Sequence, residues 1–158
     1  MRPVLVIGNK NYSSWSLRPW LAARHAGIEF DEIRVSLFTP EGNAQIQRYS
    51  PSLRVPVWRE GDFVVWDSLA ICDYLAERVS SLWPSDAAAR AIARSVSAEM
   101  HSGFTALRGG MPMNARARGR SVEITPEVVA DINRIEAIWL DCRSRFGDGG
   151  PWLFGAFS

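Results

Sequence analysis

The start of the chain places an apolar strand directly before a serine-rich turn and a helix. Residues 3–8 form an apolar run that is typical of a buried strand. The turn that follows carries Ser13, Ser14 and Ser16, and a helical pattern then extends from Leu17 to Ala26. Hydroxyls beside the free N–H groups of a helix start can hold an anion, including a thiolate.

The rest of the first half continues to alternate strand and helix patterns. Apolar and polar residues alternate over 30–35, residues 41–49 form a short helical pattern, and strands over 55–58 and 63–66 flank a turn. A helix follows over 68–79. This βαβαββα order predicts a small mixed sheet flanked by helices, in an α/β domain over residues 1–80.

The second half shows helix patterns alone, which predicts an all-α domain over residues 87–158. One helix is expected from Ala87 to Leu107 and another to about Phe146, where Thr125 is the N-cap and Pro126 the first helical residue. The segment between them, residues 108–122, is expected to be a mobile loop. The apolar tail at 151–158 would expose aromatic side chains, so we expect a continuation of the chain or a partner to cover it.

Composition excludes several classes of function. The net charge is +1, so no overall field favours nucleic acid or a membrane surface. No apolar run reaches membrane-spanning length, and the N-terminus has no signal-peptide pattern. Cys72 and Cys142 form no metal-spaced or redox-spaced pair. We expect a cytoplasmic protein with reduced, buried thiols and no metal site.

Four segments resemble the glutathione S-transferase family, in particular its serine-type zeta members and bacterial proteins of that kind. They are residues 13–18, with Trp15 where the zeta motif has a cysteine, residues 50–56 before a proline that is cis in the family, residues 66–75, and residues 151–158. The resemblance implies a thioredoxin-like N-terminal domain followed by an all-helical domain. Because family members continue further, we expect Ser158 to mark a truncation of the helical domain.

The resemblance implies glutathione as substrate or cofactor, with its thiol held as a thiolate by a serine hydroxyl. In the zeta-type register Ser13 takes the catalytic place, whereas counting back from Arg18, as in delta and theta members, selects Ser14. Tyr12 is a third candidate donor. In the alternative interpretation, the serines only cap the helix.

The remaining expected contacts hold the backbone of the tripeptide. Val55 before a cis Pro56 would pair with the cysteinyl residue as an added strand does. Asp67 would meet the γ-glutamyl ammonium, and Ser68 its carboxylate at the start of a helix. By resemblance, Trp15 and Arg54 also belong to the glutathione-binding residues.

Three functions fit these residues. The first is a glutathione transferase acting on small electrophiles; the second is a non-catalytic glutathione-binding or regulatory module; the third is a glutathione-dependent isomerase of maleyl-type diacids. By resemblance we expect a homodimer, with the helices around Ile71 and Met100 as possible contacts.

Overall fold

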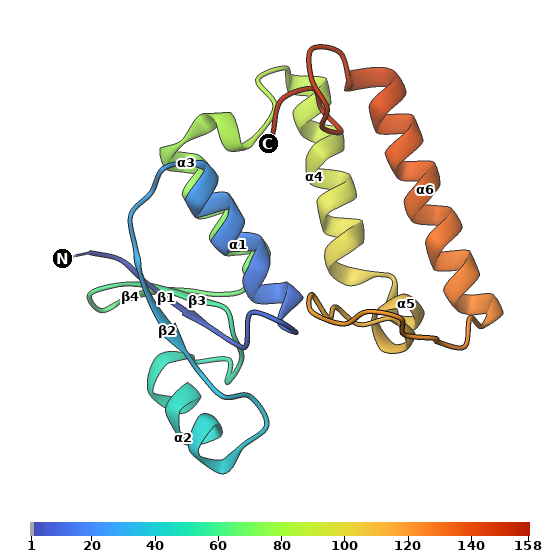
Figure 1. The fold of residues 1–158 in the computed structure, drawn as a ribbon. Helices are drawn as coiled ribbons and strands as arrows, with labels where there is room; N and C mark the ends of the chain where they lie inside the picture. The colour runs from blue at the N-terminus through green and yellow to red at the C-terminus, as the bar shows by residue number, and fades with distance from the viewer. Residues whose placement is uncertain (1) are drawn as a thin grey trace. The chain divides into compact units, whose positions relative to one another are not determined.

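The computed structural model describes residues 2–158 (Figure 1). The chain forms two compact units. The first contains the residues up to Val79 together with Met113–Ala115, and the second contains Ser80–Pro112 and Arg116–Ser158. Each unit is described by itself.

The first unit has the predicted βαβαββα order. Its elements are β1 (Val4–Ile7), α1 (Ser14–His25), β2 (Asp31–Arg34), α2 (Pro40–Tyr49), β3 (Val57–Glu60), β4 (Phe63–Val65) and α3 (Ser68–Arg78). The sheet order is β2-β1-β3-β4. Strand β2 runs parallel to β1, whereas β3 runs antiparallel to both β1 and β4.

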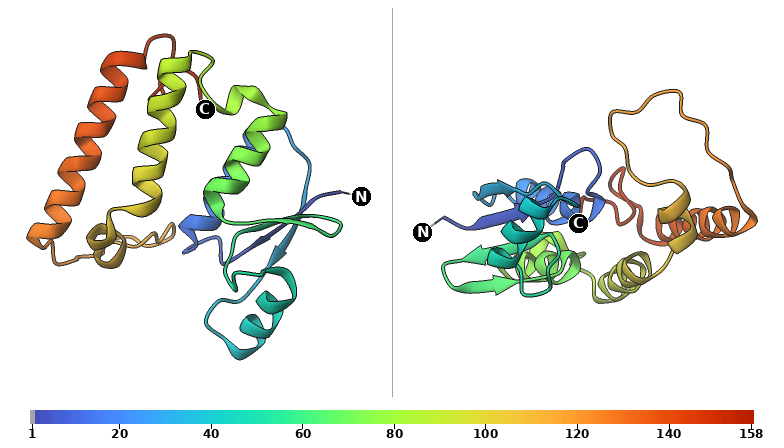
Figure 2. Two further views of the ribbon diagram at one scale, coloured as in Figure 1. Left: turned by 180° about the vertical axis from the view of Figure 1, so that it is seen from behind. Right: turned by 90° about the horizontal axis from the view of Figure 1, so that it is seen from below.

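Alternating side chains of the sheet divide the core of this unit into two layers. Val6 and Val57 pack with Ile46 of α2 on one face. Leu5 and Trp58, one position along each strand, are fully buried and point to the opposite face. There α1 and α3 lie side by side (Figures 1 and 2). Strands β1 and β4 both run antiparallel to β3, so they point the same way. The helices that follow these two strands, α1 and α3, therefore begin at the same end of the sheet.

The second unit consists of helices, as predicted, but with an additional break. After η1 (Ser80–Leu82) come α4 (Ala87–Ser102), α5 (Thr105–Gly110) and α6 (Pro126–Phe146). The single helix expected over 87–107 divides at Phe104, which has a left-handed φ of 60°. The Arg108 side chain donates to the carbonyls of Met100 and Gly103 and so holds this break. Thr125 caps α6, as predicted, by accepting from the Val128 N–H.

The apolar tail folds back onto the helical unit, which corrects the expectation that its aromatic side chains would be exposed. Leu153 and Phe154 pack against the core of the helical unit, which Phe104, Ile135, Ile138 and Cys142 form. The ring of Phe154 stacks on Phe146 at 5.5 Å, and Phe157 meets Trp152 edge-on at 5.0 Å. Of the three tail aromatics, only Trp152 remains largely exposed, at 51%. The sequence pattern could not show this turn back onto α6.

No helix within residues 2–158 is both long enough and apolar enough to cross a membrane.

Candidate functional site

Strand register brings three segments of the first unit to one end of the sheet. Strand β1 ends beside the start of β3, because Val6 pairs with Val57. Strand β4 ends at the same edge, because Val65 pairs with Trp58. The chain leaving β1, the chain entering β3 and the chain leaving β4 therefore meet there. The predicted site residues lie on these segments: Tyr12, Ser13, Ser14 and Trp15 on the first; Arg54, Val55 and Pro56 on the second; Asp67 and Ser68 on the third.

The turn after β1 is closed by its own backbone. The carbonyl of Asn9 accepts from the N–H groups of Tyr12, at 3.2 Å, and Ser13, at 2.8 Å. Helix α1 then begins at Ser14, three residues earlier than predicted, so Ser13 occupies the N-cap position. The serines thus belong to the start of the helix itself.

Ser13 does not cap this helix, which corrects the interpretation of the serines as mere caps. No side chain caps α1 by a hydrogen bond, and no acidic residue lies in its first turn. By contrast, Thr39, Asp67, Asp86 and Thr125 each cap the helix that follows them. The positive end of the α1 dipole is therefore not neutralised from within the first turn.

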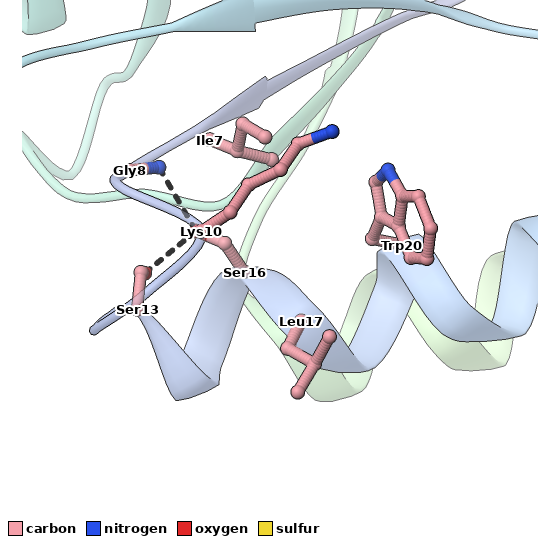
Figure 3. Close-up of a pocket in the computed structure, with 7 residues that line it drawn as sticks. All are labelled: Ile7, Gly8, Lys10, Ser13, Ser16, Leu17 and Trp20. Atoms are coloured by element: carbon pink, nitrogen blue, oxygen red, sulfur yellow. Dashed lines mark hydrogen bonds between the residues drawn. The ribbon is translucent and has the colours of Figure 1, made fainter. Parts of the chain in front are cut away.

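Instead, the Ser13 hydroxyl belongs to a short hydrogen-bonded chain (Figure 3). The Oγ of Ser13 donates to the Oγ of Ser16 at 2.8 Å, and the Gly8 N–H donates to the same Ser16 atom at 3.1 Å. Ser16 is only 4% exposed. This chain ties the end of β1 to the first turn of α1 inside the unit.

A pocket of about 200 Å³ lies beside Ser13. It is lined by Ile7, Gly8, Lys10, Ser13, Ser16, Leu17 and Trp20, which Figure 3 shows as sticks. The Lys10 ammonium lies 2.6 Å from the Glu32 carboxylate, which also accepts from the Trp20 indole at 2.7 Å. Partial burial raises the pKa of Glu32, but hydrogen bonds from Lys10, Trp20 and Arg24 outweigh it and lower that pKa. These contacts fix one wall of the pocket.

Gly8 is required by close packing against the same serine. A Cβ at this position would lie 3.1 Å from both the Oγ and the Cβ of Ser13 and 2.7 Å from Cδ1 of Leu37. The sequence did not single out Gly8 or Ser16 for the site, because their contacts depend on how the turn folds back.

The other candidates near Ser13 stand apart from the pocket. Ser14 is the first residue of α1 and does not line the pocket. Tyr12 is 60% exposed. The Trp15 ring lies under the Arg18 guanidinium, with 4.2 Å between Cζ and the ring centroid. Of the three serines near the turn, Ser13 and Ser16 reach the pocket.

The segment entering β3 is organised by Ser50. Its hydroxyl accepts from the Arg54 N–H at 3.2 Å and lies 3.1 Å from the Ser52 hydroxyl. The Val55–Pro56 peptide bond is cis, as the resemblance implies. Val55 precedes the strand ladder, which begins at Val57, and Arg54 is exposed.

At the start of α3, Asp67 is the N-cap residue. The Asp67 carboxylate accepts from the N–H groups of Leu69, at 3.0 Å, and Ala70, at 3.4 Å. Ser68 is the first helical residue and only 1% exposed. Within residues 2–158 its hydroxyl has no hydrogen-bond partner. The site thus contains a buried, unsatisfied polar atom, which is rare in folded proteins.

Neither cysteine has the surroundings of a reactive thiol. Burial raises the pKa of Cys72 on α3 to about 12. Burial also raises the pKa of Cys142. Both are unpaired in the structure. In the described part of the chain, no cluster of three or more His, Cys, Asp or Glu side chains could hold a metal ion.

Comparisons with known proteins agree with this fold. Residues 12–78 match the family model of the glutathione S-transferase N-terminal domain. A probable maleylacetoacetate isomerase of Caenorhabditis elegans is 32% identical over 108 residues, which cover 67% of this chain and 50% of that protein. The chain belongs to the glutathione S-transferase family. It spans about half the length of the maleylacetoacetate isomerases that it matches.

Other known proteins match in part or in fold. A dichloromethane dehalogenase of Methylophilus leisingeri is 42% identical over 64 residues, or 37% of this chain and 24% of that protein. An unclassified glutathione S-transferase of Bombyx mori has a TM-score of 0.72 at 22% identity, over 98% of this chain and 74% of that one. A glutathione transferase homologue from Burkholderia, solved with bound glutathione, has a TM-score of 0.70 at 20% identity, over 98% and 76%. The chain therefore has the family fold, a thioredoxin-like domain followed by a helical part.

Proposed function

We propose that this glutathione S-transferase relative binds glutathione at the end of the sheet where the segments after β1, before β3 and after β4 meet. There the Ser13 hydroxyl holds the glutathione sulfur as a thiolate. The observation that carries the proposal is the hydroxyl of Ser13 at a helix start that no side chain caps, beside a pocket. Ser13 is favoured over Ser14, because Ser14 does not line that pocket.

Simple energetics support this role. An unperturbed thiol has a pKa of about 8.5, and lowering it by two units needs about 2.7 kcal/mol in favour of the thiolate. A hydrogen bond to a charged group contributes about 1.5–3 kcal/mol. An unneutralised helix N-terminus adds about 0.3–1 kcal/mol. One hydroxyl and the α1 dipole are therefore sufficient, and no general base is required.

The segments before β3 and after β4 supply groups for the tripeptide backbone. Val55, which stands before the β3 ladder, offers its N–H and C=O for strand-like pairing with the cysteinyl residue. Asp67 is exposed and carries the negative charge that suits the γ-glutamyl ammonium. The unsatisfied Ser68 hydroxyl is a donor for the carboxylate, and its burial means that its cover must move slightly. The exposed Arg54 suits the carboxylate of the glycyl end.

Two reactions use such a thiolate. In conjugation, the thiolate sulfur forms a bond to an electrophilic carbon, a leaving group such as halide departs with the electron pair of the bond that breaks, and the glutathione conjugate is released. In isomerisation of a maleyl-type diacid, sulfur adds to the double bond, the carbon–carbon bond rotates, and elimination restores glutathione. The named maleylacetoacetate isomerase relatives favour the second reaction as an alternative. Trp15, at the place of the zeta motif's cysteine, favours the first.

The proposal includes a homodimer. Phe63 on the edge strand β4 and Trp66 after it are both exposed large apolar residues, which suits a contact between copies. Ile71 itself is fully buried, so a contact on α3 would use other residues of that helix. Sedimentation analysis tests the homodimer, because it reports the mass of the protein in solution: twice the mass of one chain is expected, and the mass of a single chain would contradict the dimer.

Calorimetry with glutathione, followed by two assays, tests the function. We expect heat of binding, then either consumption of glutathione with an activated aryl halide or diacid isomerisation without net consumption. Binding without turnover in either assay would favour the non-catalytic module. Absence of binding by correctly folded protein would refute the glutathione site altogether.

A further inference from the structure

We propose that Ser16 is a positioning residue that acts through Ser13, so that two hydroxyls rather than one stabilise the glutathione thiolate. This inference rests on the proposed function. It starts from the chain in which the Gly8 N–H and the Ser13 hydroxyl both donate to the Oγ of Ser16. Ser16 would not touch glutathione, since its effect passes through the oxygen of Ser13.

The bond between the two serines can reverse. A hydroxyl has one proton and two lone pairs, so either serine can donate to the other at 2.8 Å. When Ser13 turns its proton toward sulfur, its oxygen becomes free to accept from Ser16. Two hydroxyls rotate, no covalent bond is broken, and no proton moves between residues.

The Gly8 N–H leaves the Ser16 proton available for Ser13. Its N–H occupies one lone pair of the Ser16 oxygen at 3.1 Å and stays there in both arrangements. The Ser16 proton is then free to turn to Ser13. Accepting from Ser16 polarises the Ser13 hydroxyl and strengthens its own donation to a negative sulfur. The backbone of β1 therefore supports the charge through two side chains.

Burial increases the effect. Ser16 is 4% exposed and Gly8 is also buried, so little water competes for these bonds. A Cβ on Gly8 would lie 3.1 Å from Ser13 Oγ, so the close approach of the strand also restricts where that hydroxyl can stand. The rigid surroundings keep the two oxygens within hydrogen-bond distance during the rotation.

The test compares the pKa of bound glutathione in the wild type, Ser16→Ala and Ser16→Thr. The pKa is read from thiolate absorbance and from the pH profile of kcat/KM. A lost neutral hydrogen bond predicts that Ser16→Ala raises the thiol pKa by about 0.4–1.1 units. The loss in kcat/KM at neutral pH is about two- to tenfold, while glutathione affinity at low pH changes less than threefold. Ser16→Thr retains the hydroxyl and should restore the wild-type pKa.

Two further measurements keep the result unambiguous. If Ser16→Ala fails to fold, Ser16→Cys fills the same space with a weak donor and should raise the pKa in the same way. An unchanged thiol pKa in folded Ser16→Ala or Ser16→Cys, with a raised pKa in Ser13→Ala, would overturn the relay and leave the proposed function intact. A wild-type protein that does not lower the thiol pKa would instead overturn the proposed function, and the relay with it.

Discussion

Helices α1 and α3 begin at the same edge of one sheet, but their first turns are satisfied differently. At α3 the Asp67 carboxylate takes two N–H groups, while the Ser68 hydroxyl beside it is buried without a partner. At α1 no side chain caps the first turn, and Ser13 donates toward Ser16 instead. A carboxylate thus already lies at the positive end of the α3 dipole, whereas neither a side-chain cap nor an acidic residue lies in the first turn of α1. In the proposed function, charge stabilisation therefore belongs to α1 and recognition of the glutathione backbone to α3.

The largest expected effect is at Ser13. Ser13→Ala removes a hydrogen bond to charged sulfur worth about 1.5–3 kcal/mol, or about a 10- to 150-fold loss in kcat/KM. Ser14→Ala is the matched control, because it changes the neighbouring hydroxyl outside the pocket and should cost less than about threefold. Steady-state kinetics at saturating glutathione measures both. A larger loss for Ser14→Ala would move the catalytic role to Ser14.

Gly8→Ala tests the packing around Ser13. The new Cβ pushes on the Ser13 side chain and on Leu37, and such overpacking costs about 1–3 kcal/mol of unfolding free energy. Because Ser13 is displaced, kcat/KM should fall as well. Gly109→Ala in α5 is the control, since nothing lies within 4 Å of its added Cβ. Chemical denaturation and kinetics together measure the effect, and unchanged kinetics in Gly8→Ala would show that Ser13 tolerates movement.

At α3, Asp67→Ala and Asp67→Asn separate the cap from the charge. Loss of an N-cap side chain costs about 0.5–2 kcal/mol of unfolding free energy, whereas Asn keeps the capping oxygen. Both variants lose the negative charge that we assign to the ammonium of glutathione. For an exposed pair this predicts about two- to fivefold weaker binding. Calorimetry should find equal affinities for the two variants. Wild-type affinity in Asp67→Asn would show that the negative charge of Asp67 does not contribute to glutathione binding.

Ser68→Ala should weaken glutathione binding without reducing stability. Removing an unsatisfied buried hydroxyl leaves the unfolding free energy unchanged or raises it by up to about 1 kcal/mol. Glutathione binding should weaken, because the carboxylate loses a donor. Thermal unfolding with and without glutathione separates the two effects. Clear destabilisation by Ser68→Ala would indicate that this hydroxyl is structural.

The smallest effect concerns pH, at the far end of α3. A hydrogen bond from Arg78 lowers the pKa of Glu60, with weaker contributions from Trp58 and Tyr74. A lowered pKa stabilises the fold above the unfolded value of about 4.5, and this stability is lost as the pH falls through the folded pKa. Acid denaturation of Glu60→Gln should therefore show a weaker pH dependence than the wild type. Identical acid curves would contradict this link between β3 and α3.

Local signals in the sequence predicted the elements better than their ends. Thr125 with Pro126 marked the start of α6 correctly, because a cap and a first-turn proline act within one turn. The start of α1 was placed three residues too late, because Ser14, Trp15 and Ser16 add little to an apolar helical pattern. The break at Phe104 depends on Arg108 reaching back to carbonyls, which no local pattern contains.

The candidate site was predictable in its segments but not in its connections. The resemblance selected Ser13, Val55 and Asp67 on three separate segments, and the strand register brings those segments to one end of the sheet. It did not separate Ser13 from Ser14, and Ser16 had a role only in the alternative interpretation of the serines as caps. The part played by Ser16 depends on contacts across the turn, which no local pattern contains. Its hydroxyl accepts from the N–H of Gly8, eight residues earlier.

The most direct test is a titration of thiolate absorbance for glutathione bound to the wild-type protein and to Ser13→Ala. The account predicts a thiol pKa well below the free value of about 8.5 in the wild type and a return toward that value in Ser13→Ala. Equal pKa values in the two proteins, with glutathione bound to both, would contradict it.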